Sequence, residues 1–159
     1  MKSRLEGDFS VRQGRLAQEA WRISSQINAA LRVTKPGGVV FAAYCGSDAT
    51  AIQVCFGKGM LRDPRVKALV DPVTFKLSST PEEVFTQHRR EDIDALMDSL
   101  PATRLHFVGT DLFTLYMKDS IDQMDGELYE LYLHYHFAVC ERPDLVGASN
   151  HYLDIFQKH

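Results

Sequence analysis

The sequence has no apolar stretch approaching the about 20 residues that a membrane-spanning helix needs. Its N-terminus also has no apolar segment of the kind found in secretory signals. Cys45, Cys55 and Cys140 show no C-x-x-C spacing, so they predict neither a zinc site nor a disulfide framework. The net charge of −3 gives no electrostatic reason to expect a nucleic acid or a membrane as partner. We therefore expect a cytoplasmic protein with free thiols.

The 159 residues fit one domain, and they contain helix and strand patterns in alternation. Apolar residues at steps of three and four predict a helix over 15–33, and the stretch "KPGG" at 35–38 ends it. Val39–Cys45 follows and is apolar on both faces, which is typical of an inner strand of a covered sheet. Further strands are expected over Arg104–Gly109 and Ser149–Lys158, the latter with Tyr152, Asp154 and Phe156 on one face.

Helices are predicted between these strands. Asp48 is placed to cap a helix that continues to Phe56, and Thr80 begins a capping-box pattern for an interrupted helix to Leu100. Thr110 or Asp111 caps the next predicted helix, through Met124, and a long helix then extends to Cys140. The chain therefore belongs to the α/β class by its pattern.

The element order, with "LRVTKPGG" at 31–38 ahead of a buried strand, resembles the C-terminal half of the class I S-adenosylmethionine-dependent methyltransferase family. The resemblance covers roughly residues 27–158. It implies the fifth strand of a Rossmann-like sheet at Val39–Cys45, a helical insertion over 46–100, and the sixth and seventh strands at Arg104–Gly109 and Ser149–Lys158. The seventh strand would then lie antiparallel between the fifth and the sixth. Residues 1–26 form a lead-in and the start of the helix, and 27–159 the methyltransferase-like half.

The resemblance implies methyl transfer from S-adenosylmethionine to a small-molecule acceptor. The chain, however, has no glycine-rich turn after a strand, the feature that lets backbone N–H groups approach such a cofactor. Gly57-Lys58-Gly59 falls at a predicted helix end instead. We expect an incomplete methyltransferase that lacks the cofactor-binding half, with no cofactor-binding residues of its own. The alternative is a non-catalytic remnant or interaction module that pairs through an open sheet edge.

Four residues are candidates for contact with the acceptor. Tyr44 and Asp48 stand near the carboxyl end of the predicted fifth strand, where open α/β sheets bind ligands; packing of Tyr44 and capping by Asp48 are the alternative. Tyr132 and His136 lie on the predicted helix "ELYELYLHYHFAVC", which is apolar nearly all round and so is expected to be buried or to cover a pocket. On this helix the functional interpretation is an aromatic wall of an acceptor site with a histidine as base, and the alternative is core packing. No metal site is expected.

The same pattern makes a prediction about association. Without a fourth strand, Val39–Cys45 would present an apolar, uncharged edge with free backbone groups, which is a template for pairing with another chain. We therefore expect the protein to be dimeric or prone to aggregation, and a homodimer would pair through the Val39–Cys45 edge.

Overall fold

The computed structural model describes residues 21–79 and 85–159. Four strands form one sheet: β1 (Val39–Gly46), β2 (Gln87–His88), β3 (Ala102–Gly109) and β4 (His151–Lys158). A helix covers residues 21–33, and the further α-helices of the described residues are α2 (Ser47–Thr50), α3 (Pro64–Lys67), α4 (Arg90–Met97), α5 (Lys118–Ile121) and α6 (Gly126–Val139). The π-helical η1 (Ala51–Gly57) continues α2, and η2 (Met60–Arg62) and η3 (Val146–Ala148) are short 3-10 turns. The first 20 residues of the predicted 1–26 lead-in lie outside the described residues.

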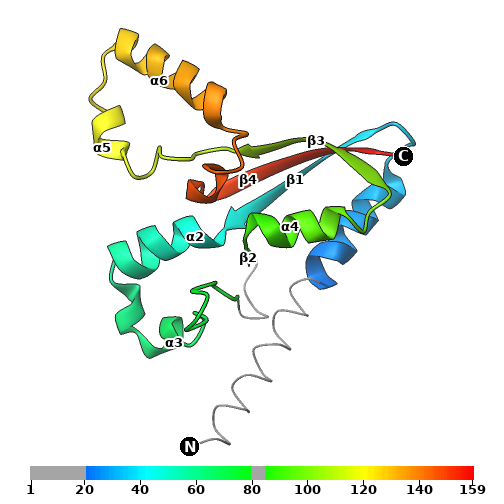
Figure 1. Cartoon of the computed structure of the whole chain (residues 1–159), viewed down its shortest axis with the longest axis horizontal. Coiled ribbons are helices and arrows are strands. Elements are labelled where there is room, and N and C mark those ends of the chain that lie inside the picture. Colours follow the sequence, from blue (N-terminus) through cyan, green and yellow to red (C-terminus); the bar gives the residue numbers. More distant parts are fainter. Residues whose placement is uncertain (1–20, 80–84) are drawn as a thin grey trace, which may run out of the picture.

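The sheet has the order β2-β1-β4-β3. β4 is antiparallel to both of its neighbours, β1 and β3, so β1 and β3 run in the same direction. β2 is parallel to β1 and pairs only with its last two residues, Cys45 and Gly46. The predicted α/β class and the predicted position of the last strand, antiparallel between the other two predicted strands, are therefore confirmed. Figure 1 shows these strands crossing the middle of the molecule.

One face of this sheet carries the main hydrophobic core. The helix at residues 21–33 and α4 both pack there, because their apolar side chains form a single cluster with alternate residues of β1 and β4. The members of the cluster are Ile27, Leu31, Val40, Ala42, Tyr44, Ile93, Met97, Leu100, Phe107, Val146, Tyr152 and Phe156. As predicted, Tyr152, Asp154 and Phe156 lie together on this buried side of β4.

The other face of β1 is not covered by the described residues. Phe41 is 66% exposed and Val39 is 43% exposed, although the strand is apolar on both sides. The expectation of a sheet covered on both faces is therefore wrong for the part of the chain that the structure describes. An apolar pattern on both faces of a strand indicates that both faces can be covered. It does not indicate which part of the chain covers them.

The "KPGG" turn ends the first helix as predicted, after residue 33. Gly37 has a φ of 76°, a conformation that side chains other than glycine rarely adopt. Its N–H donates to the carbonyl of Lys158 at 2.9 Å, and the N–H of Lys158 donates to the carbonyl of Gly38 at 2.9 Å. The turn thus connects the helix to β1 and holds the end of β4.

The predicted interrupted helix from Thr80 to Leu100 is shorter than expected. Residues 80–84 lie outside the described part, and Gln87–His88 form a strand, β2, rather than helix. α4 begins only at Arg90, where the carboxylate of Asp92 accepts the backbone N–H of Arg89 at 2.8 Å.

An arm formed by α5 and α6 extends from the end of β3. The helix expected from Thr110 or Asp111 to Met124 is reduced to α5, because the Asp111 carboxylate binds the Ser149–His151 turn instead of capping a helix. α6 is confirmed, and Asp125 caps it by accepting from the N–H of Leu128 at 2.9 Å.

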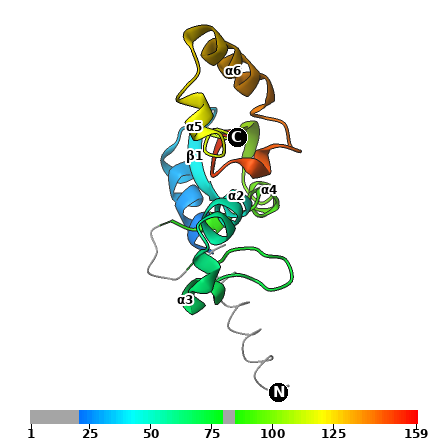
Figure 2. The same cartoon turned by 90° about the vertical axis from the view of Figure 1, so that its left-hand side faces the viewer.

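α6 was expected to be buried or to cover a pocket, and among the described residues it is not buried. Val139 is the only buried residue of this helix, whereas large apolar side chains on it are half or more exposed: Leu128, Leu131, Tyr135 and Phe137. Figures 1 and 2 show α6 at one end of the molecule and α3 at the other, with the sheet between them. The helix is apolar nearly all round, but among the described residues most of its apolar side chains are not covered.

Candidate functional site

Tyr44 lies near the carboxyl end of β1 and faces the core, where it is 7% exposed. Its ring makes an edge contact with the imidazole of His88, with centroids 6.1 Å apart. Burial raises the pKa of the Tyr44 phenol, and the negative charge of Asp154 adds to the effect, so the hydroxyl stays protonated. This hydroxyl has no hydrogen-bond partner within the part of the chain that is described. The packing alternative for Tyr44 is therefore the one that the described residues show.

His88 is the second polar group beside Tyr44. It is buried, and its Nε2 lies 2.6 Å from the hydroxyl of Thr86. Burial lowers the pKa of His88 to about 4; Asp92 opposes this shift and Lys76 adds to it. The imidazole is therefore neutral at neutral pH. Sequence reasoning missed His88 because it placed the residue inside a helix, although β2 pairs it with Gly46.

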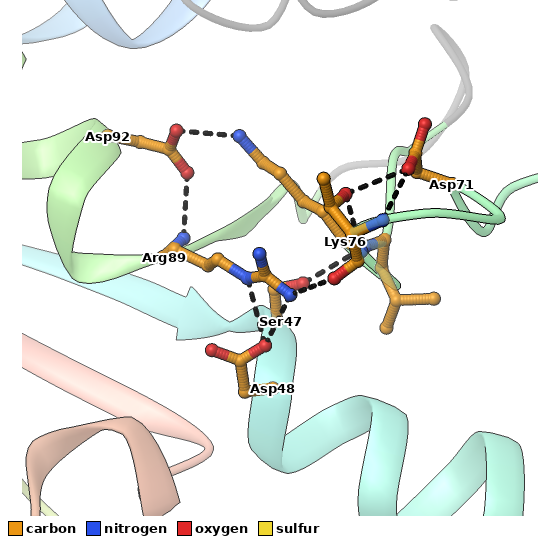
Figure 3. A network of polar contacts seen from close by, with 8 residues as sticks. Ser47, Asp48, Asp71, Lys76, Arg89 and Asp92 are labelled. Carbon is orange, nitrogen blue, oxygen red and sulfur yellow. Dashed lines mark hydrogen bonds and ion pairs between the residues drawn. The ribbon is translucent and has the colours of Figure 1, made fainter.

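Asp48 does not cap a helix, so that prediction is wrong. Gly46 occupies the capping position of α2 and Asp48 lies in the first turn. The carboxylate of Asp48 forms an ion pair with Arg89, at 2.8 Å from its terminal nitrogen and 2.9 Å from Nε. The guanidinium also donates to the carbonyl of Thr74 at 2.7 Å (Figure 3). The local sequence pattern indicated that Asp48 caps a helix, but Asp48 instead pairs with Arg89, which is 41 residues away.

The surrounding network fastens the loop at residues 71–77 to the end of β1 (Figure 3). The buried hydroxyl of Ser47 accepts the N–H of Leu77 at 3.0 Å. Lys76 pairs with Asp92 of α4 at 2.6 Å. The carboxylates of Asp48 and Asp92 each form an ion pair, with Arg89 and Lys76. Contact of Asp48 with an acceptor stays a prediction.

Tyr132 and His136 lie on α6, on an arm that Figure 1 shows apart from β1 and α2. Their rings are 6.5 Å apart, and the hydroxyl of Tyr132 is 2.6 Å from that of Thr114. The structure thus brings Tyr132 and His136 together and, separately, places Tyr44 and Asp48 on neighbouring elements. It does not join the two pairs into one pocket.

A groove of about 340 Å³ lies beside Tyr44, along the edge of β1. It is lined by residues of the helix at 21–33, by the consecutive β1 residues Val40–Cys45, and by Phe85, Thr86 and His88. β2 pairs with Cys45 and Gly46 only, so within the described residues no strand pairs with this edge from Val39 to Tyr44. We call this stretch, Val39–Tyr44, the open edge. Its backbone can hydrogen-bond to an extended chain.

Within residues 21–79 and 85–159, the glycine pair and the acids that follow strands, the groups that would bind S-adenosylmethionine, make other contacts. Gly57 ends η1, and the N–H of Gly59 donates to the carbonyl of Phe56, so this glycine pair forms a helix-end turn as expected. The acids that follow strands also have partners: Asp48 pairs with Arg89, and Asp111 pairs with His151. Over residues 21–79 and 85–159, no group of three or more histidine, cysteine or acidic side chains is placed to hold a metal ion.

The chain matches no family model and no curated protein. In the part of the chain described by the structure, every helix is too short or too polar to cross a membrane.

Proposed function

We propose that this protein is an interaction module that accepts an extended strand along the open edge of β1, and that the strand comes from a second copy of the chain. The observation that carries the proposal is the pairing of β1: β4 lies along one side of it, while β2 reaches only its last two residues on the other.

The chemistry of the open edge favours strand addition. Val39–Tyr44 contains no charged residue, proline or bulge, which are the features that protect sheet edges in many proteins. Phe41 projects from this strand with two thirds of its surface exposed. The short parallel pairing with β2 supports the idea that this side of β1 accepts a strand.

A second copy is the occupant that this edge fits best. Two identical strands related by a twofold axis run antiparallel, and a continuous sheet requires that opposite residues share a face. An axis through Phe41 satisfies both conditions and sets Val39 opposite Ala43 of the partner. Phe41 then lies opposite the same residue of the partner, an aromatic pair of the kind that stabilises antiparallel sheets.

Analytical ultracentrifugation over a range of concentrations tests this proposal. We expect a dimer in the micromolar range, and we expect Phe41→Lys to raise its dissociation constant at least about tenfold, because two like charges would face each other across the axis. Phe137→Lys is the matched control, since Phe137 is equally apolar and 72% exposed but lies on α6.

Two outcomes contradict the proposal. One is a monomer at high micromolar concentration. The other is a dimer that Phe137→Lys dissociates and Phe41→Lys does not, which would assign the interface to the α5–α6 arm. Binding of an unrelated extended peptide with no self-association would keep the open edge as the site and exclude the second copy as its occupant.

We propose as a second candidate that the chain is the C-terminal part of a methyltransferase acting on a small molecule, with S-adenosylmethionine bound by residues outside this chain. The order β1-β4-β3 with an antiparallel middle strand supports this proposal, because the family resemblance implies the same arrangement. Calorimetric titration of S-adenosylmethionine into the purified chain should show no binding. Saturable one-site binding at micromolar concentration would contradict the assignment of the cofactor to residues elsewhere.

A further inference from the structure

Cys45 and His151 are paired across β1 and β4 on the exposed face of the sheet. Cys45 is directly opposite His151 in the pairing of β1 with β4. Residues opposite each other in an antiparallel pair share a face, and their Cβ atoms are roughly 4.5–5.5 Å apart. Cys55 and Cys140 are both buried, whereas Cys45 is partly exposed. Cys45 is thus the one cysteine of the chain that combines exposure with a neighbouring base.

The imidazole of His151 is oriented by Asp111. Nδ1 of His151 lies 2.7 Å from Oδ2 of Asp111, and the ring is 59% exposed. When Nδ1–H donates to the carboxylate, the lone pair is on Nε2, which is the tautomer that a general base needs. The Asp111 side chain is itself held in place, because it accepts from the hydroxyl of Ser149 at 2.5 Å and from the N–H of Asn150 at 2.7 Å.

The environment of Cys45 keeps the thiol protonated at rest. Burial raises the pKa of the Cys45 thiol, and the negative charge of Asp111 raises it further. A thiol of this kind reacts as a nucleophile when a nearby base removes its proton during the attack. His151 is the base that the strand register places beside it.

We propose that Cys45, His151 and Asp111 form a nucleophile, base and orienting acid that together accept an activated acyl group from an ester or a thioester. The site lies where β1 and β3 end, at the edge of an α/β sheet where ligands bind. It is independent of the strand addition proposed above, since it uses side chains on the face of the sheet rather than the backbone of its edge.

The proposed step balances without an added oxidant or reductant. Nε2 of His151 takes the thiol proton as the bond from Sγ to the acyl carbon forms. The bond from that carbon to the leaving oxygen or sulfur breaks, and the imidazolium returns the proton to the leaving group. Water then cleaves the acyl–cysteine thioester, which releases a carboxylic acid and restores the thiol.

The competing explanation is that Asp111 only stabilises the turn at Ser149–His151. His106 provides a matched comparison, because its Nδ1 lies 3.0 Å from a carboxylate oxygen of Glu141 and its side chain is 55% exposed. Its partners differ, however: His106 is opposite Ile155 in the sheet, and no cysteine lies across from it.

Acylation by p-nitrophenyl acetate tests the proposal on the full chain. We expect release of p-nitrophenol with acetylation of Cys45, identified by peptide mass spectrometry. In Cys45→Ala the peptide that contains position 45 should carry no acetyl group. His151→Gln should lower the acetylation rate at least about 100-fold, the typical contribution of a general base. His106→Gln should leave the rate unchanged, and added imidazole should partly restore the rate in His151→Ala.

Circular dichroism of each variant separates loss of the base from loss of the fold. A folded His151→Gln protein whose Cys45 acetylates at the original rate would overturn the proposal, as would equal rates at Cys45 and at the thiol of a short unstructured peptide. Acetylation is measured at Cys45 itself and the dimer by ultracentrifugation, so failure of one proposal is distinguishable from failure of the other.

Discussion

The guanidinium of Arg104 on β3 donates two hydrogen bonds, of 2.8 and 2.7 Å, to the carboxylate of Asp154 on β4. Asp154 is fully buried, and Arg104 lies over the ring of Phe107 at 4.8 Å from its centroid. Arg104 also pairs with Asp94 of α4. One cation therefore neutralises the buried charge of the sheet and connects two strands to the helix that covers them.

Replacement of Arg104 by methionine should strongly destabilise the fold. The substitution would leave the Asp154 carboxylate buried without its cation. We expect this to lower the free energy of unfolding by about 3–5 kcal/mol. Arg142→Met is the control, because Arg142 pairs with Asp144 on the surface and both side chains are more than half exposed. Urea denaturation should show a large shift for the first variant and none for the second. Equal midpoints would show that the buried pair does not stabilise the sheet.

Gly38→Val should also destabilise the protein. A Cβ atom at Gly38 would lie 2.7 Å from Cγ2 of Thr34 and 2.9 Å from the carbonyl oxygen of Lys35, so the "KPGG" turn would have to move. We expect a loss of about 1–3 kcal/mol in the free energy of unfolding. Gly126→Val serves as control, since nothing lies within 4 Å of a Cβ atom there. An unchanged denaturation midpoint for Gly38→Val would argue against the tight packing of this turn.

Tyr44→Phe should leave the fold intact and raise its stability. The substitution removes a buried hydroxyl that has no partner among the described residues, and an unsatisfied buried polar group costs about 1–3 kcal/mol. Tyr132→Phe should have the opposite effect, a loss of about 1 kcal/mol, because its hydroxyl is bonded to Thr114. A Tyr44→Phe protein that is less stable than the natural chain would show that the hydroxyl is bonded in solution.

The sequence predicted the last strand and the end of the first helix, because short stretches of neighbouring residues determine both. The alternation of Tyr152, Asp154 and Phe156 placed the last strand with its correct buried face, and "KPGG" fixed the helix end before β1. β2 was not predicted, because two residues are too short to show a period and its position depends on pairing with Cys45 and Gly46.

The candidate site was predicted less completely, because it depends on contacts between distant residues. Asp48 carries a capping signal, yet Arg89 determines its role. Asp111 likewise binds a turn 38 residues later, and no local pattern encodes that contact. The opposition of Cys45 and His151 arises from strand register, which a single sequence leaves open until the partner strands are known.

The buried imidazole of His88 should make the stability of the protein depend on pH. Its pKa is about 4 in the folded protein, against 6.5 for an ordinary histidine. Well above pH 6.5 the ring is neutral in both states and contributes no pH dependence. As the pH falls below 6.5 the unfolded chain binds a proton that the folded protein does not, so stability decreases until about pH 4, where the folded protein titrates too.

The measurement is the difference in the free energy of unfolding between pH 7 and pH 5, obtained from urea denaturation. His88 should account for about 2 kcal/mol of the loss at pH 5, given its folded and unfolded pKa values. His88→Gln should remove that part of the slope, whereas His134→Gln, at an exposed position on α6, should retain it. The comparison uses slopes, so a uniform loss of stability from the broken contact with Thr86 does not affect it. Parallel slopes for the natural chain and His88→Gln would mean that His88 titrates normally and is open to water.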